Sequence, residues 1–574
     1  MSSWWIFYIL IIFDTSPFFC HKCGTDFLIK KLNLKANRVP NKITRRRLNN
    51  AFTPINILID ATILVEQRDN GILSSYSYTK IQAEFDYLAK YYLRKMIYVQ
   101  HESYSTEEII NLYEKNCNLK CGHDYHYEYY GEDDPYDLSI FPQIDESGKH
   151  LSSDAIMGAN PCLFSSNGRP IGGIVYLSKN LISQINSGNK IDIDYHIRNT
   201  LFHELFHVLG FIPRFFSKKY TENGYTYLNS PKLLAKAKMH FGCDSLKGLR
   251  LEDQGGTGTV GSHWDARYMQ GELMIGVDYS EKVLSDMTLA FLEDLGFYKV
   301  NYYTGGLFRF GKNEGCSFFK KKCIYSEGTL FPNEFCYRPG EPFCSGSLTS
   351  KGYCFIYEYK DIIPKKYRYF SQEKMGGEIM TDYCPISFYS DESSNFFYPS
   401  VCYYGKSEYD GERKGGKSIC FKSSINLDSK KSICYSVECD RVNKKIRVIT
   451  DRYDIICDGE KKELIDPNGL KGSLLCPDYN MVCTSDIWCN NIYNCIENNS
   501  ITDKNTFYYI SNKAKLLQLD NEKLKVNDSL TFDINSLKKD NEKSTNDDSN
   551  NGLNIKYDWV KLIWQFALII INFI

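Results

Sequence analysis

The chain has 574 residues, of which 43% are hydrophobic and 15% aromatic, and its 69 basic and 70 acidic side chains leave a formal net charge of -1. This length is too great for one ordinary domain and sufficient for two or three, each with its own core. A nearly neutral chain has no overall electrostatic attraction for nucleic acid or for an anionic membrane, so we expect no nucleic-acid partner.

The 21 cysteines are unevenly distributed along the chain. Two lie at positions 20 and 23, four between 117 and 243, and fifteen between 316 and 495. Such a density in the last group is typical of a disulfide framework formed in an oxidising compartment.

The first feature in chain order is an unbroken apolar run over residues 4–13. It is too short to cross a bilayer and has the length of the core of a secretory signal. No Lys or Arg precedes the run, and a buried strand is the alternative. We expect a signal peptide over residues 1–19.

Strand-like and helix-like patterns alternate between residues 48 and 211. The apolar runs PINILIDATILVE and GGIVYLS indicate strands, and YTKIQAEFDYLAKYYLRKM has helical spacing. This alternation predicts a mixed sheet flanked by helices.

Candidate catalytic residues lie in the segment IRNTLFHELFHVLGF around residue 200, whose apolar residues recur at helical spacing. His203 and His207 are four residues apart, so both imidazoles project to one side of a helix, with Glu204 beside them. Zinc takes neutral nitrogen donors, and Glu204 is placed to take a proton from a water whose pKa the metal lowers. This is the HExxH arrangement of zinc peptidases, a motif that also occurs by chance.

A catalytic zinc needs a third protein ligand and an open fourth position. The compact pattern HExxHxxGxxH places a third histidine six residues after the second, but Pro213 occupies that position here. Of the two later histidines, His240 lies in a Lys-rich helical stretch where a surface histidine is expected. His263 lies in the glycine-rich segment GGTGTVGSHWDARYMQGELMIG, which can fold back onto the helix.

A carboxylate is the alternative third ligand, with Glu252 and Glu272 as the nearest candidates. Met274 follows His263 by eleven residues and lies in a tight-turn context between Gly271 and Gly276.

The remainder of the chain divides into three compositions. Residues 311–497 are Tyr-rich, Gly-punctuated and dense in cysteine, which predicts strands and loops with little helix. Residues 498–557 are rich in Asn, Asp, Lys and Ser, with glycosylation sequons at Asn498 and Asn527, and are expected to form a solvated stalk. Residues 558–574 are hydrophobic and, with the small polar cluster around Ser549, form the pattern of a GPI-attachment signal. A short tail anchor and a buried terminal helix are the alternatives.

Several segments in the same order resemble the leishmanolysin family of surface zinc peptidases, which belongs to the metzincin clan. HELFHVLGF resembles its zinc helix, and SHWDARYMQGELMIG resembles its third-ligand segment and Met-turn. The likeness extends over NPCLFSSNGRPIGGIVYL, DMTLAFLEDLGFY, MTDYCPI, SICYSVECD and LLCPDYNMVC, and covers roughly residues 50 to 495.

The resemblance implies His203, His207 and His263 as ligands of one zinc ion, Glu204 as the general base and Met274 as the Met-turn residue beneath the metal. The family commonly has Glu where this chain has Asp265, a position that is not an expected ligand.

The segment HKCGTD at 21–26 resembles the family's propeptide motif. Cys23 would then be a thiolate ligand that silences the zymogen until the propeptide leaves, and a disulfide with Cys20 is the alternative. The arginines at 45–47 suggest a maturation site.

The implied fold class is α+β: a metzincin-like catalytic lobe with a mixed sheet and the active-site helix, a second lobe carrying the third ligand and the Met-turn, and a disulfide-rich, mainly β C-terminal domain. The expected segments are a signal peptide (1–19), a propeptide (20–47), the catalytic lobe (48–211), the central lobe (212–310), the cysteine-rich domain (311–497), the stalk (498–557) and the tail (558–574). Substrate is expected in the cleft between the two lobes.

The implied function is that of a secreted or cell-surface zinc metalloendopeptidase acting on protein or peptide substrates. A GPI anchor would hold it at the extracellular face of the plasma membrane. The alternative is a surface adhesion or binding protein with a residual or structural zinc site.

Overall fold

The structure is a computed structural model that describes residues 51–103, 136–186, 193–302, 308–388 and 406–483 apart from short gaps, together with 46–47, 402 and several residues between 109 and 117. The predictions for the signal peptide, Cys23, the stalk and the GPI tail lie outside the described residues. Within the described ranges, no helix combines the length and hydropathy that a membrane-crossing segment requires.

A four-stranded mixed sheet forms the first part of the molecule. Its strand order is β3 (Ile57–Ile59), β6 (Leu138–Ile144), β8 (Pro170–Leu177) and β7 (Met157–Phe164). β3, β6 and β8 run parallel, and β7 is the antiparallel edge strand. β7 and β8 are buried along their whole length, as expected for strands covered on both faces.

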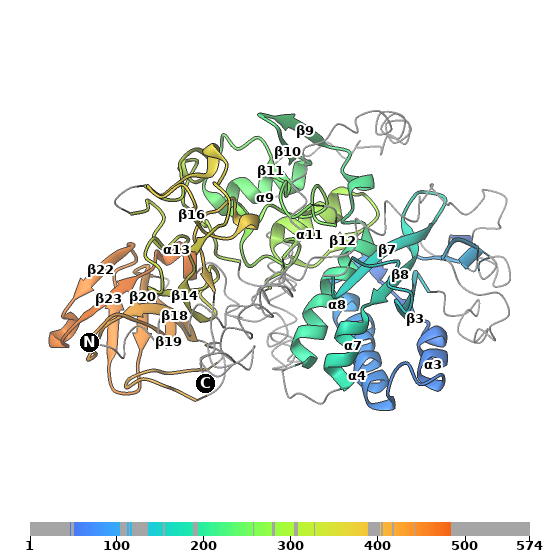
Figure 1. Ribbon diagram of the computed structural model, residues 1–574, viewed down its shortest axis with the longest axis horizontal. Helices are drawn as coiled ribbons and strands as arrows, with labels where there is room; N and C mark the ends of the chain where they lie inside the picture. The colour runs from blue at the N-terminus through green and yellow to red at the C-terminus, as the bar shows by residue number, and fades with distance from the viewer. Residues whose placement is uncertain are drawn as a thin grey trace, which may run out of the picture. The chain divides into compact units, whose positions relative to one another are not determined.

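Helices cover this sheet, and the helix that carries the HExxH motif packs directly on β7 and β8. Figure 1 shows α4, α7 and α8 gathered beside the strands. The helical segments are α3 (Thr62–Asp69), α4 (Ser75–Asp86), which continues through a π-helical stretch (Tyr87–Leu93) into α5 (Arg94–Met96), then α7 (Lys179–Asn186) and α8 (Ile193–Leu209).

A glycine sets the distance between α8 and the sheet. A Cβ atom at Gly173 of β8 would lie 2.3 Å from Cγ1 of Val208, so any larger residue would push the helix outward. The bare backbone of β8 lets the helix approach closely.

Between α8 and the cysteine-rich region, short strands and helices surround the segment that contains His263. A hairpin of β9 (Lys219–Glu222) and β10 (Tyr225–Leu228) pairs with β11 (Leu249–Arg250), and α9 (Pro231–Phe241) packs against α11 (Asp286–Asp294). α10 (Ala266–Met269) follows His263. β12 (Lys299–Val300) returns to pair with β4 (Ile97–Val99), which also pairs with β2 (Thr53–Pro54).

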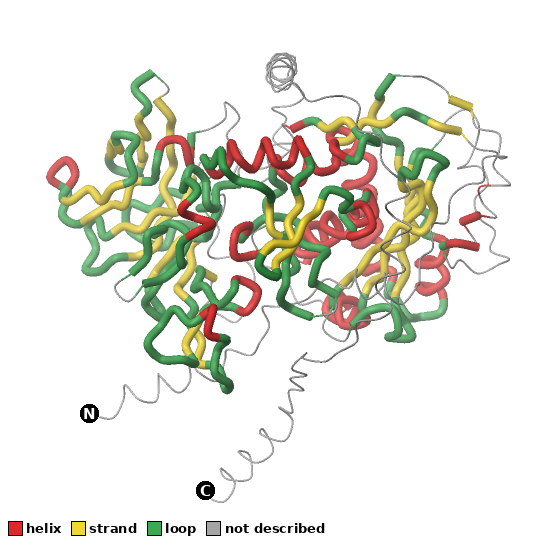
Figure 2. Tube along the Cα trace, turned by 90° about the horizontal axis from the view of Figure 1, so that it is seen from above, coloured by secondary structure: helices red, strands yellow, loops and turns green. Residues whose placement is uncertain are grey.

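The C-terminal part is mainly β, as predicted. Its antiparallel six-stranded sheet has the order β21 (Asp454–Cys457), β20 (Lys445–Ile449), β19 (Lys431–Asp440), β18 (Ser418–Ser423), β23 (Ser473–Cys476) and β22 (Lys462–Ile465). The other strands and α-helices of this part are α12 (Ser317–Lys320), β13 (Pro342–Cys344), β14 (Lys351–Cys354), β15 (Tyr357–Glu358), β16 (Met375–Gly376), β17 (Ser387–Phe388) and α13 (Tyr479–Val482). In Figure 2 the C-terminal part, at the left, is mostly strand and loop.

Near the start of the chain, the two short strands β1 (Arg46–Arg47) and β5 (Glu102–Ser103) pair with each other.

Eight disulfide bonds join sixteen of the described cysteines, which confirms the predicted disulfide framework. The pairs are 117–162, 243–316, 323–384, 336–354, 344–420, 402–434, 439–483 and 457–476.

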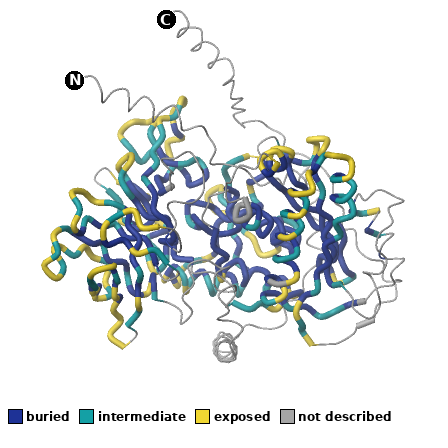
Figure 3. Tube along the Cα trace, turned by 90° about the horizontal axis from the view of Figure 1, so that it is seen from below, coloured by how far each residue is buried: buried dark blue, intermediate teal, exposed yellow. Residues whose placement is uncertain are grey.

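Two main hydrophobic cores organise the described residues. The larger one includes residues from Ile55 through α8 and α11 to Ile386, and the second is formed mainly by residues of the six-stranded sheet. Buried stretches, dark blue in Figure 3, follow the strands and the central helices, whereas exposed residues collect on outer loops. The predicted α+β class with a disulfide-rich C-terminal region is confirmed.

Candidate active site

Helix α8 brings His203, Glu204 and His207 into the larger core. The apolar residues Ile197, Leu201, Leu205 and Val208 are buried at helical spacing. All three chemistry-bearing side chains are buried as well, with exposed fractions of 3% or less. A buried imidazole or carboxylate needs a partner, so their surroundings decide what they can do.

The way α8 ends orients His207. Gly210 has φ +124, and the amide of Phe211 donates to the carbonyl of Phe206 at 2.9 Å, the six-to-one bond of a Schellman ending. The turn brings the carbonyl of Phe211 back against the helix, where it accepts a hydrogen bond from Nδ1 of His207 at 2.6 Å.

His263 is presented by a loop that folds onto the neighbouring backbone. Its carbonyl accepts from the amide of Glu252 at 2.9 Å, and the next residue, Trp264, donates its amide to the carbonyl of Met274 at 2.9 Å. Nδ1 of His263 lies 3.0 Å from the carbonyl of Thr259 and 2.8 Å from Oγ of Ser262.

A glycine permits this arrangement, because a Cβ at Gly276 would lie 2.1 Å from Cγ2 of Thr259.

The turn that contains Met274 orients the remaining histidine. The carbonyl of Leu273 accepts a hydrogen bond from Nδ1 of His203 at 2.7 Å. Met274 is fully buried in the same core. The predicted tight turn therefore lies beside the histidine cluster.

The three Nε2 atoms converge. They are 3.0 Å apart for His203 and His207, 3.2 Å for His207 and His263, and 3.3 Å for His203 and His263. Among the residues that the structure describes, these three histidines form the group of side chains close enough to share a metal ion.

The hydrogen bonds at Nδ1 determine whether the converging Nε2 atoms are donors or acceptors. Each Nδ1 faces a backbone carbonyl, which can only accept, so each imidazole carries its hydrogen on Nδ1 and a lone pair on Nε2. Three lone pairs then face one another in a buried site and cannot bond to each other. Two nitrogens each about 2.05 Å from a tetrahedral ion lie about 3.3 Å apart, so the donor set and its spacing fit zinc.

Electrostatics keep the histidines neutral. Burial, reinforced by the neighbouring His207, lowers the pKa of His203 well below 6.5, and burial together with His263 does the same for His207. Burial lowers the pKa of His263 to about 4. The charge of Lys282, which sequence reasoning did not single out, lowers the pKa of His203 and His263 further. Neutral imidazoles are the form that binds a metal.

The alternative third ligands are not part of the histidine group. Nε2 of His240 lies 2.9 Å from the carbonyl of Phe310, and its ring stacks on Phe308 with centroids 5.0 Å apart. His240 is half-buried and partnered rather than fully exposed, and it lies outside the histidine group, as expected.

The two candidate carboxylates bind backbone amides instead. Glu252 accepts from the amides of Gln254 at 2.8 Å and Ala266 at 3.2 Å. Glu272 accepts from the amides of Met274 and Ser285.

Asp265 has a separate structural role. It caps α10 by accepting from the amide of Arg267 at 2.8 Å, and it pairs with the buried guanidinium of Arg250 at 2.5 Å. Arg250 also pairs with Asp382 at 2.8 Å, which links the third-ligand segment to the cysteine-rich region.

Comparison with known proteins finds similarity over more than half of the chain. Residues 150–490 match the model of the Peptidase_M8 family, described as leishmanolysin. A leishmanolysin homolog of Crithidia fasciculata is 28% identical over 370 residues, covering 58% of this chain and 54% of that protein. Leishmanolysin of Leishmania major is 27% identical over 353 residues, covering 57% of each. A leishmanolysin-like peptidase of Caenorhabditis briggsae is 30% identical over 308 residues, covering 45% of each. The matched stretch therefore spans about half the length of these relatives.

Proposed function

Because this chain belongs to the leishmanolysin family, we propose that it is a zinc metalloendopeptidase that hydrolyses protein or peptide substrates. The observation that carries the proposal is the convergence of three neutral Nε2 atoms, 3.0 to 3.3 Å apart, two of them from the helix that also carries the buried Glu204.

The site residues divide between holding the metal and moving the proton. His203, His207 and His263 would hold one zinc ion. Bound there, zinc would supply polarisation of the scissile carbonyl and a lowered pKa for the attacking water. Glu204 takes a proton from that water and passes it to the leaving amine. The carbonyls of Phe211, Leu273 and Thr259 hold the imidazoles in the required tautomer throughout.

We also propose a location outside the cytosol. Eight disulfide bonds among the described residues support folding in an oxidising compartment. Attachment to the cell surface by a GPI anchor and silencing by Cys23 belong to the same proposal and rest on sequence patterns alone.

The direct test is the variant Glu204→Gln, which keeps the shape of the side chain and removes its ability to take a proton. Zinc content should stay at the wild-type value, while kcat for peptide hydrolysis should fall by about 10²- to 10⁴-fold. Zinc is measured by mass spectrometry, and activity with a quenched-fluorescence peptide before and after removal of residues up to 47.

Glu222→Gln provides the matched control, because Glu222 lies exposed on β9. Full activity in Glu204→Gln would contradict the proposal. A wild-type chain that binds zinc but hydrolyses no peptide would favour the adhesion alternative.

A further inference from the structure

Glu272 is fully buried in the turn that follows the third histidine, and the proposed reaction does not use it. Its Oε2 accepts from the amide of Met274 at 2.5 Å. Its Oε1 accepts from the amide of Ser285 at 3.0 Å, from Oγ of Ser285 at 2.9 Å and from Oγ1 of Thr288 at 2.5 Å. Four donors on one carboxylate fix it firmly between the turn and the start of α11.

The amide that Glu272 binds belongs to the same peptide group as the carbonyl that orients His203. That group joins Leu273 to Met274, and it is planar, so its N–H and C=O point in opposite directions. The carboxylate binds the N–H end, and Nδ1 of His203 donates to the C=O end at 2.7 Å. A carboxylate at one end makes the carbonyl at the other a stronger acceptor, because hydrogen bonds in series polarise each other.

The same carboxylate also reaches the neighbour of His263. Oγ1 of Thr288 donates to Glu272 and accepts from Nε1 of Trp264 at 2.8 Å. Trp264 and Thr288 are both fully buried, and Trp264 directly follows His263. The network therefore connects the peptide group that orients His203 with the side chain of the residue that follows His263.

We propose that Glu272 is a positioning residue of the metal centre, which acts on His203 through the Leu273–Met274 peptide group and on the His263 segment through Thr288 and Trp264. In many metal sites a carboxylate binds a ligand histidine directly, and loss of such a partner weakens metal binding about 10- to 100-fold. Here the peptide group lies between the carboxylate and the histidine. The inference rests on the metal centre of the proposed function and not on the peptidase reaction.

The competing role is purely structural, since the same carboxylate anchors the first turn of α11. A structural role would cost stability alone. A positioning role changes the zinc affinity and the ligand field of the metal in protein that remains folded.

Two variants separate these roles. In Glu272→Gln the side chain keeps its volume. Its NH₂ group must then face one of the two backbone amides, of Met274 or Ser285, from which the wild-type carboxylate accepts. Thr288→Val is nearly isosteric and removes the hydroxyl between Glu272 and Trp264.

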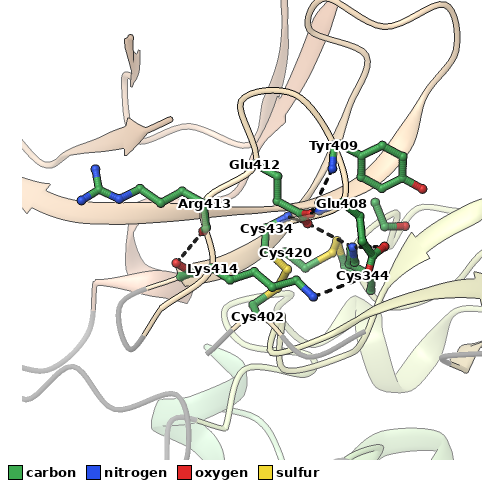
Figure 4. A network of polar contacts seen from close by, with 12 residues as sticks. Cys344, Cys402, Glu408, Tyr409, Glu412, Arg413, Lys414, Cys420 and Cys434 are labelled. Carbon is green, nitrogen blue, oxygen red and sulfur yellow. Dashed lines mark hydrogen bonds and ion pairs between the residues drawn. A yellow bond between two sulfur atoms is a disulfide. The ribbon is translucent and has the colours of Figure 1, made fainter. Parts of the chain in front are cut away.

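The matched control is Glu412→Gln. Glu412 is equally buried and accepts from the amides of Glu408 at 2.6 Å and Cys434 at 3.1 Å. As Figure 4 shows, it lies in the cysteine-rich part beside the disulfides of Cys402–Cys434 and Cys344–Cys420. Its partner Cys434 belongs to the core of the six-stranded sheet, whereas the apolar residues of α8 belong to the larger core.

The experiment measures zinc affinity by competition with a chromophoric chelator, and the visible spectrum of the cobalt-substituted protein, in the full chain. It is carried out at pH 8, because burial raises the pKa of Glu272 to about 7 and the carboxylate is then mostly ionised. Zinc affinity should fall about tenfold or more in Glu272→Gln and several-fold in Thr288→Val, with a changed cobalt spectrum. Glu412→Gln should keep both wild-type values.

Wild-type zinc affinity and cobalt spectrum in both variants, with only a lower melting temperature, would overturn the proposal. If Glu272→Gln does not fold, Thr288→Val decides alone by the same criteria. Weaker zinc binding in the variants of a chain that hydrolyses no peptide would uphold the positioning role while the proposed function fails.

Discussion

Three backbone carbonyls determine the chemistry of the histidine cluster. Phe211, Leu273 and Thr259 each accept from one Nδ1, so that three Nε2 lone pairs point to one position. Because carbonyls cannot donate, this pattern does not depend on the side chains at these three positions. A metal cation can satisfy all three of these buried acceptors at once.

At this scale, substitution of the two later histidines should give opposite results. His263→Ala removes one of the three converging nitrogens and should lower zinc affinity by more than the 10- to 100-fold typical of losing a ligand's hydrogen-bond partner. His240→Ala breaks the contact with Phe310 and should cost about 1 kcal/mol of stability while leaving zinc bound. Zinc content after dialysis against a weak chelator compares zinc binding in the two variants. Loss of zinc in His240→Ala alone would assign the third ligand to His240.

Sequence predicted the residues of the site better than their partners. Spacing alone predicts His203, Glu204 and His207 on one face of a helix, because the helical period is fixed. His263 is 56 residues from His207, and no local rule spans that interval, so a carboxylate ligand such as Glu272 stayed open until the family resemblance was considered. The three orienting carbonyls have no sequence signal, since every residue has a carbonyl.

At the scale of elements, the contact between α8 and β8 places the zinc helix on the sheet. Val208 lies on the same helix as the two histidines and packs on Gly173, where no side chain keeps the elements apart. The sequence predicts the strand GGIVYL but not this approach, which depends on the register between two distant segments.

Gly173→Ala should therefore destabilise the fold. The added methyl would lie 2.3 Å from Cγ1 of Val208, and overpacking of this kind costs about 1–3 kcal/mol. Shortening the facing side chain in the double variant Gly173→Ala/Val208→Ala should recover part of that loss. Urea denaturation of the two single variants and the double variant measures the coupling, and unchanged stability in Gly173→Ala would show that the contact does not constrain the helix.

At the scale of the whole molecule, one hydrophobic core joins the site-bearing part and the cysteine-rich region, which the sequence composition separates. Hydrophobic residues from Ile55 to Ile386 share it, so the first part of the cysteine-rich region packs with the site-bearing part. The buried ion pairs of Arg250 with Asp265 and Asp382 link the same regions. Composition cannot show this, because core membership depends on long-range contacts.

The disulfides show the same limit of prediction. The density of cysteines predicts a disulfide framework, but spacing does not determine which cysteines pair. Cys323 pairs with Cys384, 61 residues away, whereas Cys336 and Cys354 pair within that interval.

The central claim is that three histidines hold one zinc ion on which peptide hydrolysis depends. The most direct measurement is a zinc titration of the chelator-treated, metal-free chain, after removal of residues up to 47, with peptidase activity as the readout. Activity should be absent without metal and rise in proportion to added zinc, reaching its plateau at one equivalent per chain. Activity that survives complete removal of zinc, or that bears no relation to the zinc bound, would contradict the account.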